Sequence, residues 1–188
     1  MLSQKAKVLQ ALGGRTMLNH VLTTANKISN KISVVVGFDK EGVEEEIKKI
    51  GINANTYLQK EQIGTADAVK TTLKDIDKNE KILILYGDVP LIKEETLKKL
   101  CNQESDLSIL TTNLENPTGY GRALKDKENN VLGIIEEKDA DLEQKKIKEI
   151  FTGILFIKGG LLKNFIPEIE NNNSAKEFYL TDLIGIAH

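Results

Sequence analysis

The chain has 188 residues, 40% of them hydrophobic and 29% charged, with a formal net charge of −2, so it can bury a sizeable core and has no strong field that would attract nucleic acid or a membrane surface. A single cysteine excludes an internal disulfide, and two histidines leave no Cys/His zinc cluster. Because we find neither a signal peptide nor an apolar run of 18 residues, we expect a cytoplasmic protein.

Helical and strand-like patterns alternate along the chain, which favours an α/β protein with a mixed, mostly parallel sheet and helices on both faces. The spacing of apolar residues predicts helices over 17–28, 40–50, 65–76 and 93–100, and strands over 32–36, 54–58, 82–85 and 107–112. Later β segments are expected over 120–124, 131–136 and 150–157, with a Lys-rich helix between the last two and helices over 160–165 and 178–187. No repeat or linker divides the sequence, so we predict one domain over 1–188.

The beginning of the chain departs from this pattern. A nucleotide-binding βα domain normally opens with a strand and a Gly-rich phosphate loop, whereas residues 1–9 are typical of neither. Gly13 and Gly14 follow no strand, and we interpret them as a turn before the helix that begins at Met17.

Asp88 is the first candidate site residue. Four apolar residues, 82–85, predict a buried strand that stops at a turn containing Gly87 and Asp88, which would place the carboxylate at the carboxyl end of the strand. Ligands bind at that edge of open α/β sheets, and Mg²⁺ typically takes one or two protein carboxylates together with substrate phosphates. Alternatively, Asp88 only caps the turn.

Gln59, Gly64 and Thr65 form a second candidate group, around the expected start of a helix. A Gln amide both donates and accepts, which matches the edge of a pyrimidine such as uracil, and a glycine lets a flat base approach the backbone. The alternative is an ordinary polar loop in which Thr65 caps the helix.

Three further candidates each have an ordinary alternative. The turn that contains Gly119 and Gly121 can bring backbone amides close to a sugar or phosphate, although most such turns are only turns. Glu136, at the end of a strand, can accept hydrogen bonds from sugar hydroxyls or belong to a solvated charge run. Lys7 can meet a phosphate or simply be exposed.

The order of the motifs carries more information than any one of them. The series runs Lys-Val-Leu-x-x-Leu-Gly-Gly-x-x-Met-Leu, Leu-Gln-x-x-Gln-Ile-Gly-Thr-Ala, Leu-Tyr-Gly-Asp-Val-Pro-Leu, Pro-Thr-Gly-Tyr-Gly-Arg, Ile-Ile-Glu-Glu-Lys-Asp-Ala and Glu-Phe-Tyr-Leu-Thr-Asp. Over essentially the whole chain this series resembles the N-terminal uridyltransferase domain of bacterial bifunctional N-acetylglucosamine-1-phosphate uridyltransferases. The resemblance implies a Rossmann-like, GT-A-like nucleotidyltransferase fold that lacks its first strand and Gly-rich loop.

The resemblance also implies a reaction. A phosphate oxygen of N-acetylglucosamine 1-phosphate would attack the α-phosphorus of UTP, expel pyrophosphate and form UDP-N-acetylglucosamine, a cell-envelope precursor. Catalysis would come from aligning two polyanions and neutralising their charge with Mg²⁺ and cationic side chains. The implied catalytic residues are Lys7 and Asp88.

Residue roles are implied position by position. Lys7 matches a lysine that contacts the nucleotide phosphates, and Asp88 matches a Mg²⁺ ligand. The positions that read uracil are matched by Gln59, Gly64 and Thr65. The positions that touch the sugar nucleotide or its N-acetylglucosamine moiety are matched by Tyr86, Gly87, Gly121 and Glu136.

The chain departs from the family in four respects. Met1 stands where the methionine of the family's Gly-rich loop would be, and His188 precedes the segment with the family's second Mg²⁺ ligand. Phe151 replaces a sugar-contacting Asn. The trimer-forming acetyltransferase domain has no counterpart, so we expect a monomer or weak oligomer.

These departures leave three hypotheses open: a sugar nucleotidyltransferase, a degenerate non-catalytic fragment with weak or no uridine-nucleotide binding, and a generic α/β binding module. The ordered motifs favour a family member over the generic module. From the departures we expect the chain as given to be inactive or nearly so.

Overall fold

The computed structural model describes residues 5–188, so the comparison at Met1 lies outside the described residues. The described chain divides into two compact units. Residues 5–62 together with Ile84–Glu104 form unit 1, and Ile63–Leu83 together with Ser105–His188 form unit 2. Within residues 5–188, no helix combines the length and the apolar character needed to cross a membrane.

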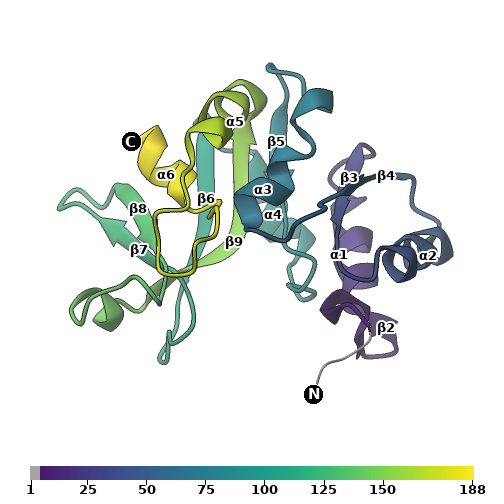
Figure 1. Ribbon diagram of the computed structural model, residues 1–188, viewed down its shortest axis with the longest axis horizontal. Helices are drawn as coiled ribbons and strands as arrows, with labels where there is room; N and C mark the ends of the chain where they lie inside the picture. Colours follow the sequence, from purple (N-terminus) through teal and green to yellow (C-terminus); the bar gives the residue numbers. More distant parts are fainter. Residues whose placement is uncertain (1–4) are drawn as a thin grey trace. The chain divides into compact units, whose positions relative to one another are not determined.

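Unit 1 contains a small parallel sheet with flanking helices (Figure 1). Its elements are η1 (Lys7–Leu9), β1 (Ala11–Leu12), β2 (Arg15–Thr16), α1 (Met17–Ala25), β3 (Ile32–Val36), α2 (Lys40–Ile50), β4 (Ala54–Leu58) and α4 (Glu94–Cys101). Strands β3 and β4 pair in parallel, with Val36 opposite Leu58. A core forms where apolar faces of α1 and α2 meet β3, and its buried members are Leu18, Leu22, Val36, Val43 and Ile47.

Local signals explain how the elements of unit 1 begin and end. Gly13 and Gly14 have positive φ angles and form the turn of the short β1–β2 hairpin, which confirms the predicted turn. The Thr16 hydroxyl accepts from the backbone N–H of Asn19 at 3.0 Å and caps α1. Helix α2 ends at Gly51, which adopts the left-handed conformation favoured at helix C-termini.

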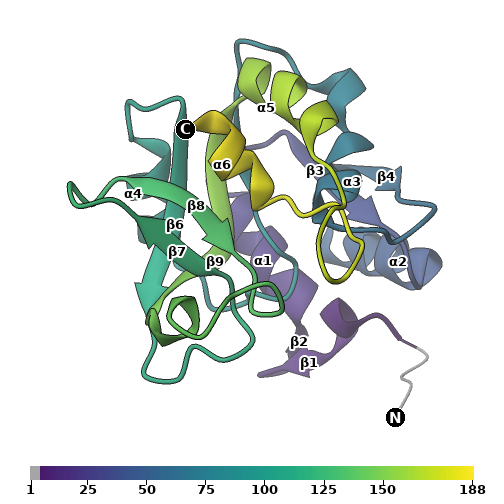
Figure 2. The same cartoon turned by 60° about the vertical axis from the view of Figure 1, so that its left-hand side comes forward.

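Unit 2 is built on a five-stranded sheet whose central strand is β9 (Glu149–Lys158). Its other strands are β5 (Lys81–Ile84), β6 (Leu107–Asn113), β7 (Arg122–Lys125) and β8 (Val131–Ile135), in the order β5-β9-β7-β8 with β6 also paired to β9. The remaining elements are α3 (Thr65–Lys70), η2 (Leu73–Asp75), η3 (Gln144–Lys146), α5 (Gly159–Phe165), η4 (Ile166–Glu168) and α6 (Asp182–Ala187). Figure 2 shows α6 packed against β8.

The central position of β9 in this sheet agrees with its run of hydrophobic residues. It is buried almost continuously, from Ile150 to Ile157, as expected for a strand covered on both faces. The α/β class and the mixed sheet are confirmed. However, the strand pairs β6–β9, β7–β9 and β7–β8 are antiparallel, and a short turn rather than a helical crossover connects β7 to β8.

Most predicted boundaries agree with the structure, and four predicted elements differ clearly from it. The helix expected over 65–76 stops at Lys70, where the hydroxyls of Thr71 and Thr72 donate to carbonyl groups three residues earlier and η2 follows. Tyr120 and Gly121 remain in a turn, so β7 begins only at Arg122. The Lys-rich helix is reduced to η3, and the last helix begins only at Asp182.

Candidate functional site

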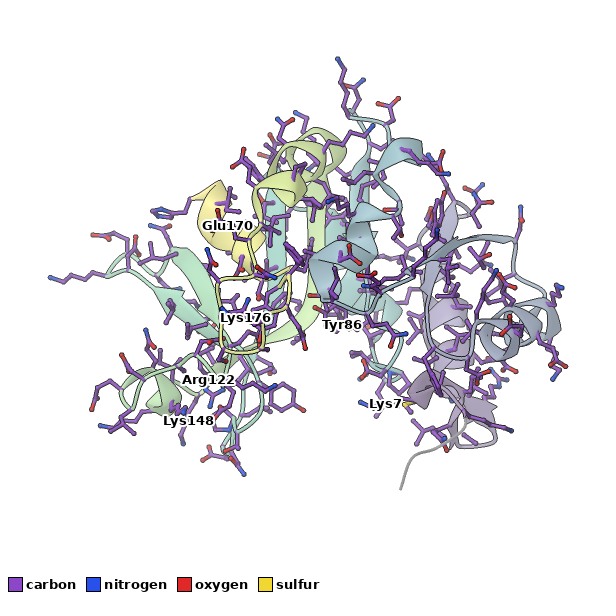
Figure 3. All side chains as sticks on the ribbon, in the orientation of Figure 1. Lys7, Tyr86, Arg122, Lys148, Glu170 and Lys176 are labelled. Carbon is purple, nitrogen blue, oxygen red and sulfur yellow. The ribbon has the colours of Figure 1, made fainter. Side chains whose placement is uncertain are left out.

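In unit 1, Lys7 and Asp88 meet although 81 positions separate them in the sequence. The Lys7 Nζ lies 2.7 Å from an Asp88 carboxylate oxygen, with exposed side-chain fractions of 73% and 34%. Figure 3 labels Lys7. An ion pair this exposed adds little to stability. Its importance is chemical, because it presents an ammonium and a carboxylate side by side at the surface of the unit.

A backbone hydrogen bond and a packing contact both stabilise the turn at Asp88. β5 ends at Ile84, and the Val89 N–H donates to the Tyr86 carbonyl at 3.3 Å, which closes the turn that carries Asp88. A side chain at Gly87 would approach Val8 Cγ1 to 3.0 Å, so the glycine lets the N-terminal segment pack on the turn. This packing brings Lys7 and Asp88 together.

Asp39 supports the same arrangement. Its backbone is left-handed (φ 56°), a conformation that Asp tolerates better than most residues, and its carboxylate accepts from the Ala6 N–H at 3.0 Å. Asp39 thereby fixes the backbone directly before Lys7. No local pattern in the sequence predicts this role of Asp39, because it depends on the contact with Ala6, 33 positions away.

In unit 2, Gly64 and Thr65 are joined to a segment near the C-terminus. The Phe178 N–H donates to Ile63 O at 2.8 Å, and the Ala66 N–H donates to Phe178 O at 2.9 Å. The Thr65 hydroxyl accepts from the Leu180 N–H at 2.9 Å and makes no helix-capping bond, because Gly64 occupies the N-cap position. The alternative in which Thr65 caps the helix is therefore wrong.

The backbone at Gly64 requires glycine. Its φ is +133°, and a Cβ there would collide with the main chain of Phe178. We expect Gly64→Ala to lower the free energy of unfolding by at least about 2 kcal/mol, measured by urea denaturation, because it adds a backbone clash to conformational strain.

Gly51→Ala is the matched control, since Gly51 also has a positive φ but nothing lies within 4 Å of its Cβ position. Its cost is expected to be about 1 kcal/mol. Equal losses in the two variants would show that contact with Phe178 is not what requires glycine at position 64.

Gln59 belongs to the other unit. Its N–H donates to Val36 O at 2.8 Å and thus extends the pairing of β4 beyond Leu58. The three predicted uracil-reading residues are therefore divided, with Gln59 in unit 1 and Gly64 and Thr65 in unit 2.

Gly121 and Glu136 are brought together within unit 2. A Cβ on Gly121 would lie 2.7 Å from Ile134 Cγ2 and 3.3 Å from a Glu136 carboxylate oxygen, so only glycine fits without displacement. The same Glu136 oxygen accepts from the Thr181 hydroxyl at 2.9 Å. The carboxylate is thus held between a glycine backbone and a buried threonine.

Glu136 also lines a cavity of about 410 Å³ in unit 2, together with Asp139, Tyr179 and Asp182. Burial raises the pKa of Glu136, and the charges of Asp139 and Glu177 raise it further against the opposing Thr181 hydrogen bond. Burial followed by the charge of Glu136 likewise raises the pKa of Asp182. A protonated or hydrogen-bonded carboxyl is therefore favoured at Glu136.

This burial gives a prediction for stability. Because the pKa of Glu136 is raised on folding, the folded state binds its proton more tightly, and the cost of ionisation appears as the pH rises above the ordinary glutamate range. We expect Glu136→Gln, which keeps an acceptor for Thr181, to be more stable than the wild type at pH 7 in urea unfolding, with the difference vanishing near pH 4.

Glu143→Gln provides the control, since Glu143 is exposed and paired with Lys146. It is expected to change stability little at either pH. A Glu136→Gln variant that is less stable than the wild type at pH 7 would contradict the account.

Phe151 is a core residue. Its side chain is 6% exposed, and its N–H donates to Gly121 O at 2.9 Å, which ties the turn to β9. An aromatic ring at this position supplies packing and no polar side-chain group.

The charge pattern around Asp88 fits one mode of metal binding. Among residues 5–188, no three His, Cys, Asp or Glu side chains are grouped to hold a metal ion. A single, partly exposed carboxylate is compatible with a Mg²⁺ ion that takes most of its ligands from water and substrate phosphates, provided that the Lys7 ammonium moves away from Asp88 when the cation binds.

Arg122, Glu137 and Thr181 were missed as site residues. Arg122 follows Gly121 in a quoted motif and Glu137 follows Glu136, but a charge run usually indicates a solvated face. Only the three-dimensional structure shows that Arg122 is buried and that Thr181 bonds to Glu136.

Comparison with known proteins identifies the family. The profile of the MobA-like NTP transferase domain matches residues 2–141. The chain belongs to this family. Nucleotidyltransferase is thus the class of enzyme to which the domain belongs.

Curated relatives of this NTP transferase domain agree along its whole length. It is 46% identical to the bifunctional protein GlmU of Thermosipho melanesiensis over 97% of the chain, and 45% identical to that of Francisella tularensis subsp. novicida over 98%. The chain spans 40% and 41%, respectively, of the length of these relatives.

Solved structures confirm the fold of the NTP transferase domain. A UDP-glucose pyrophosphorylase complexed with UDP-glucose superposes with a TM-score of 0.76 at 13% identity, covering 96% of this chain and 78% of that one. HddC from Yersinia pseudotuberculosis gives a TM-score of 0.66 at 13% identity, with coverages of 96% and 76%.

Proposed function

We propose that this chain is a sugar-1-phosphate uridyltransferase domain that converts UTP and N-acetylglucosamine 1-phosphate to UDP-N-acetylglucosamine and pyrophosphate. The two compact units together would form one nucleotidyltransferase domain over residues 1–188. The observation that carries the proposal is the 46% identity to a bifunctional protein GlmU across 97% of the chain. The matched family profile runs through parts of both units, which supports a single domain.

The phosphate chemistry would belong to Lys7 and Asp88. Bound Mg²⁺ would neutralise charge on the phosphates and on the departing pyrophosphate. Asp88 would be its protein ligand, and Lys7 would contact the nucleotide phosphates. Since the two side chains lie 2.7 Å apart, the ammonium can turn from the carboxylate to a phosphate oxygen when the metal takes its place.

Uridine recognition would belong to Gln59, Gly64 and Thr65. The Gln59 main chain is fixed by its bond to Val36, and its side-chain amide, which carries both a donor and an acceptor, would bind the edge of the base. The Thr65 hydroxyl accepts from Leu180 and so keeps its own hydrogen for donation.

Sugar recognition would belong to Tyr86 and Gly87 of unit 1 and to Gly121 and Glu136 of unit 2. The support comes from the pocket-like setting of Glu136, whose carboxylate is bound on one oxygen by Thr181. Its other oxygen can accept from sugar hydroxyl groups. We further propose a cytoplasmic protein that acts in cell-envelope precursor synthesis as a monomer or weak oligomer.

Calorimetric titration tests this function through binding alone. We expect UTP to bind in the presence of Mg²⁺ at least 10-fold more tightly than CTP, GTP or ATP. A Gln amide that donates to a uracil carbonyl and accepts from its N3–H meets a different donor and acceptor pattern on cytosine, and a purine places its pairing edge farther from the sugar. UDP-N-acetylglucosamine should bind as well. Equal binding of all four nucleotides would contradict the assignment of uridine.

Phe151 favours one alternative function, a degenerate fragment of this domain that binds uridine nucleotides weakly or not at all. A buried aromatic side chain cannot donate the hydrogen bond that an Asn amide supplies. Weak or undetectable binding of both UTP and UDP-N-acetylglucosamine would support that alternative, and tight UTP binding would contradict it.

A further inference from the structure

Arg122 is a charged side chain in the interior of unit 2. Only 1% of it is exposed, although arginine is almost never fully buried unless its charge is paired. It stands at the first position of β7, directly after the Gly119–Gly121 turn (Figure 3). Burial of a charge at this place calls for a structural or functional reason, because desolvation is costly.

The guanidinium joins the turn to the segment after β8. One Nη donates to the Tyr120 carbonyl, inside the turn, and the other donates to a Glu137 carboxylate oxygen at 2.5 Å. The same Glu137 oxygen accepts from the Gly119 N–H at 3.3 Å. The hydrogen bond from Arg122 is the main reason that the pKa of Glu137 is lowered, so the pair stays ionised near neutral pH.

The residues adjacent in sequence to this pair are the two proposed sugar contacts of unit 2. Gly121 lies between Tyr120 and Arg122, and Glu136 precedes Glu137. The Gly121 Cβ position is only 3.3 Å from a Glu136 carboxylate oxygen, so a small shift of the turn would change the space between them. The spacing between Gly121 and Glu136 therefore depends on the hydrogen bonds that their neighbours Arg122 and Glu137 make.

We propose that Arg122 and Glu137 are positioning residues that hold Gly121 and Glu136 at the spacing required by the sugar moiety of the substrate. This inference rests on the proposed function. It adds Arg122 and Glu137 as residues that do not contact the sugar themselves and act through Gly121 and Glu136. An arginine suits the role because its planar fork reaches a carbonyl and a carboxylate at once, which a lysine ammonium on a flexible stem does not reproduce.

Three variants test the pair. Arg122→Met replaces the buried charge with an apolar side chain that still fills the space. Glu137, which is 27% exposed, can then be hydrated by water. Arg122→Lys keeps the charge and removes the fork. Glu137→Gln keeps the shape and removes the charge, and Glu143→Gln on the exposed surface of the same unit is its matched control.

The measurements are the dissociation constants of UTP and UDP-N-acetylglucosamine and the thermal midpoint of each variant. We expect Arg122→Met and Arg122→Lys to weaken the binding of UDP-N-acetylglucosamine at least 10-fold, and Glu137→Gln to weaken it at least 3-fold. The dissociation constant of UTP should change less than 2-fold in all three variants. Hydrogen exchange at the Gly119 amide should accelerate in all three variants and stay unchanged in Glu143→Gln.

The outcomes separate this inference from the function on which it rests. Failure of the wild type to bind either ligand overturns the proposed function and the positioning role with it. Wild-type binding with both ligands weakened equally, in variants whose thermal midpoints fall, assigns the pair a structural role and overturns the inference. Unchanged affinities in Arg122→Met and Glu137→Gln overturn it as well.

Discussion

Replacing Asp88 by asparagine is expected to reduce the rate of Mg²⁺-dependent pyrophosphate release by at least about 100-fold. The amide keeps one neutral oxygen but loses the charge that would hold the metal. It also loses the ion pair with Lys7, whose Nζ lies 2.7 Å from the carboxylate. The measurement is kcat as a function of Mg²⁺ concentration, in the form of the protein that turns over.

Asp75→Asn is the control for this substitution, because Asp75 is an exposed carboxylate in η2. It should leave kcat and the Mg²⁺ dependence unchanged. An Asp88→Asn enzyme within 3-fold of the wild type at all Mg²⁺ concentrations would exclude Asp88 as a metal ligand.

The second large effect is expected at Phe151. Substitution by asparagine should lower the free energy of unfolding by about 3–5 kcal/mol, because it removes a large apolar side chain from the core and buries an amide. Phe151 is 6% exposed in the central strand of unit 2, so the surroundings have little freedom to hydrate the new group. Urea denaturation at pH 7 measures the change.

Phe151→Leu is the matched variant, since it keeps the site apolar, and its cost is expected to be about 1.5 kcal/mol. Affinity for UDP-N-acetylglucosamine provides a second measurement on the Asn variant. If affinity rises at least 10-fold despite the lower stability, the degenerate-fragment alternative gains support, since a lost sugar contact would have been restored.

Local patterns in the sequence predicted the elements of unit 1 well. The β-branched run of β3, the apolar face of α2 and the short strand β4 were each expected over their observed residues. These elements are defined by period and by local end signals, which a single sequence carries. The weaker predictions concern unit 2, where contacts between residues far apart in the sequence determine the local structure.

Gly64 illustrates that limit. The sequence indicated a glycine that lets a ligand approach the backbone, whereas the structure shows a chain segment there, with Phe178 main-chain atoms bonded to Ile63 and Ala66. The structure therefore supplies a packing reason for the glycine, and approach of a ligand to its backbone stays a prediction. Pairing across more than 100 residues leaves no periodic signal, so it could not have been predicted from the pattern.

Arg122 illustrates the same limit for charge. Within the sequence it ends a Gly-Tyr-Gly-Arg turn and is one of many charged residues, and its burial follows only from the meeting of β7 with β8 and β9. The candidates Lys7 and Asp88 were expected from motif order, but their 2.7 Å contact required the packing of Val8 on the Gly87 turn.

Pyrophosphate release from UTP and N-acetylglucosamine 1-phosphate tests the central claim most directly. It should be measured with and without Mg²⁺, on the 188-residue chain and on the chain extended at both ends by any flanking coding sequence. We predict Mg²⁺-dependent release that requires both substrates in at least one of the two forms. The absence of release from both forms, each shown to unfold cooperatively, would contradict the claim that this domain is a uridyltransferase.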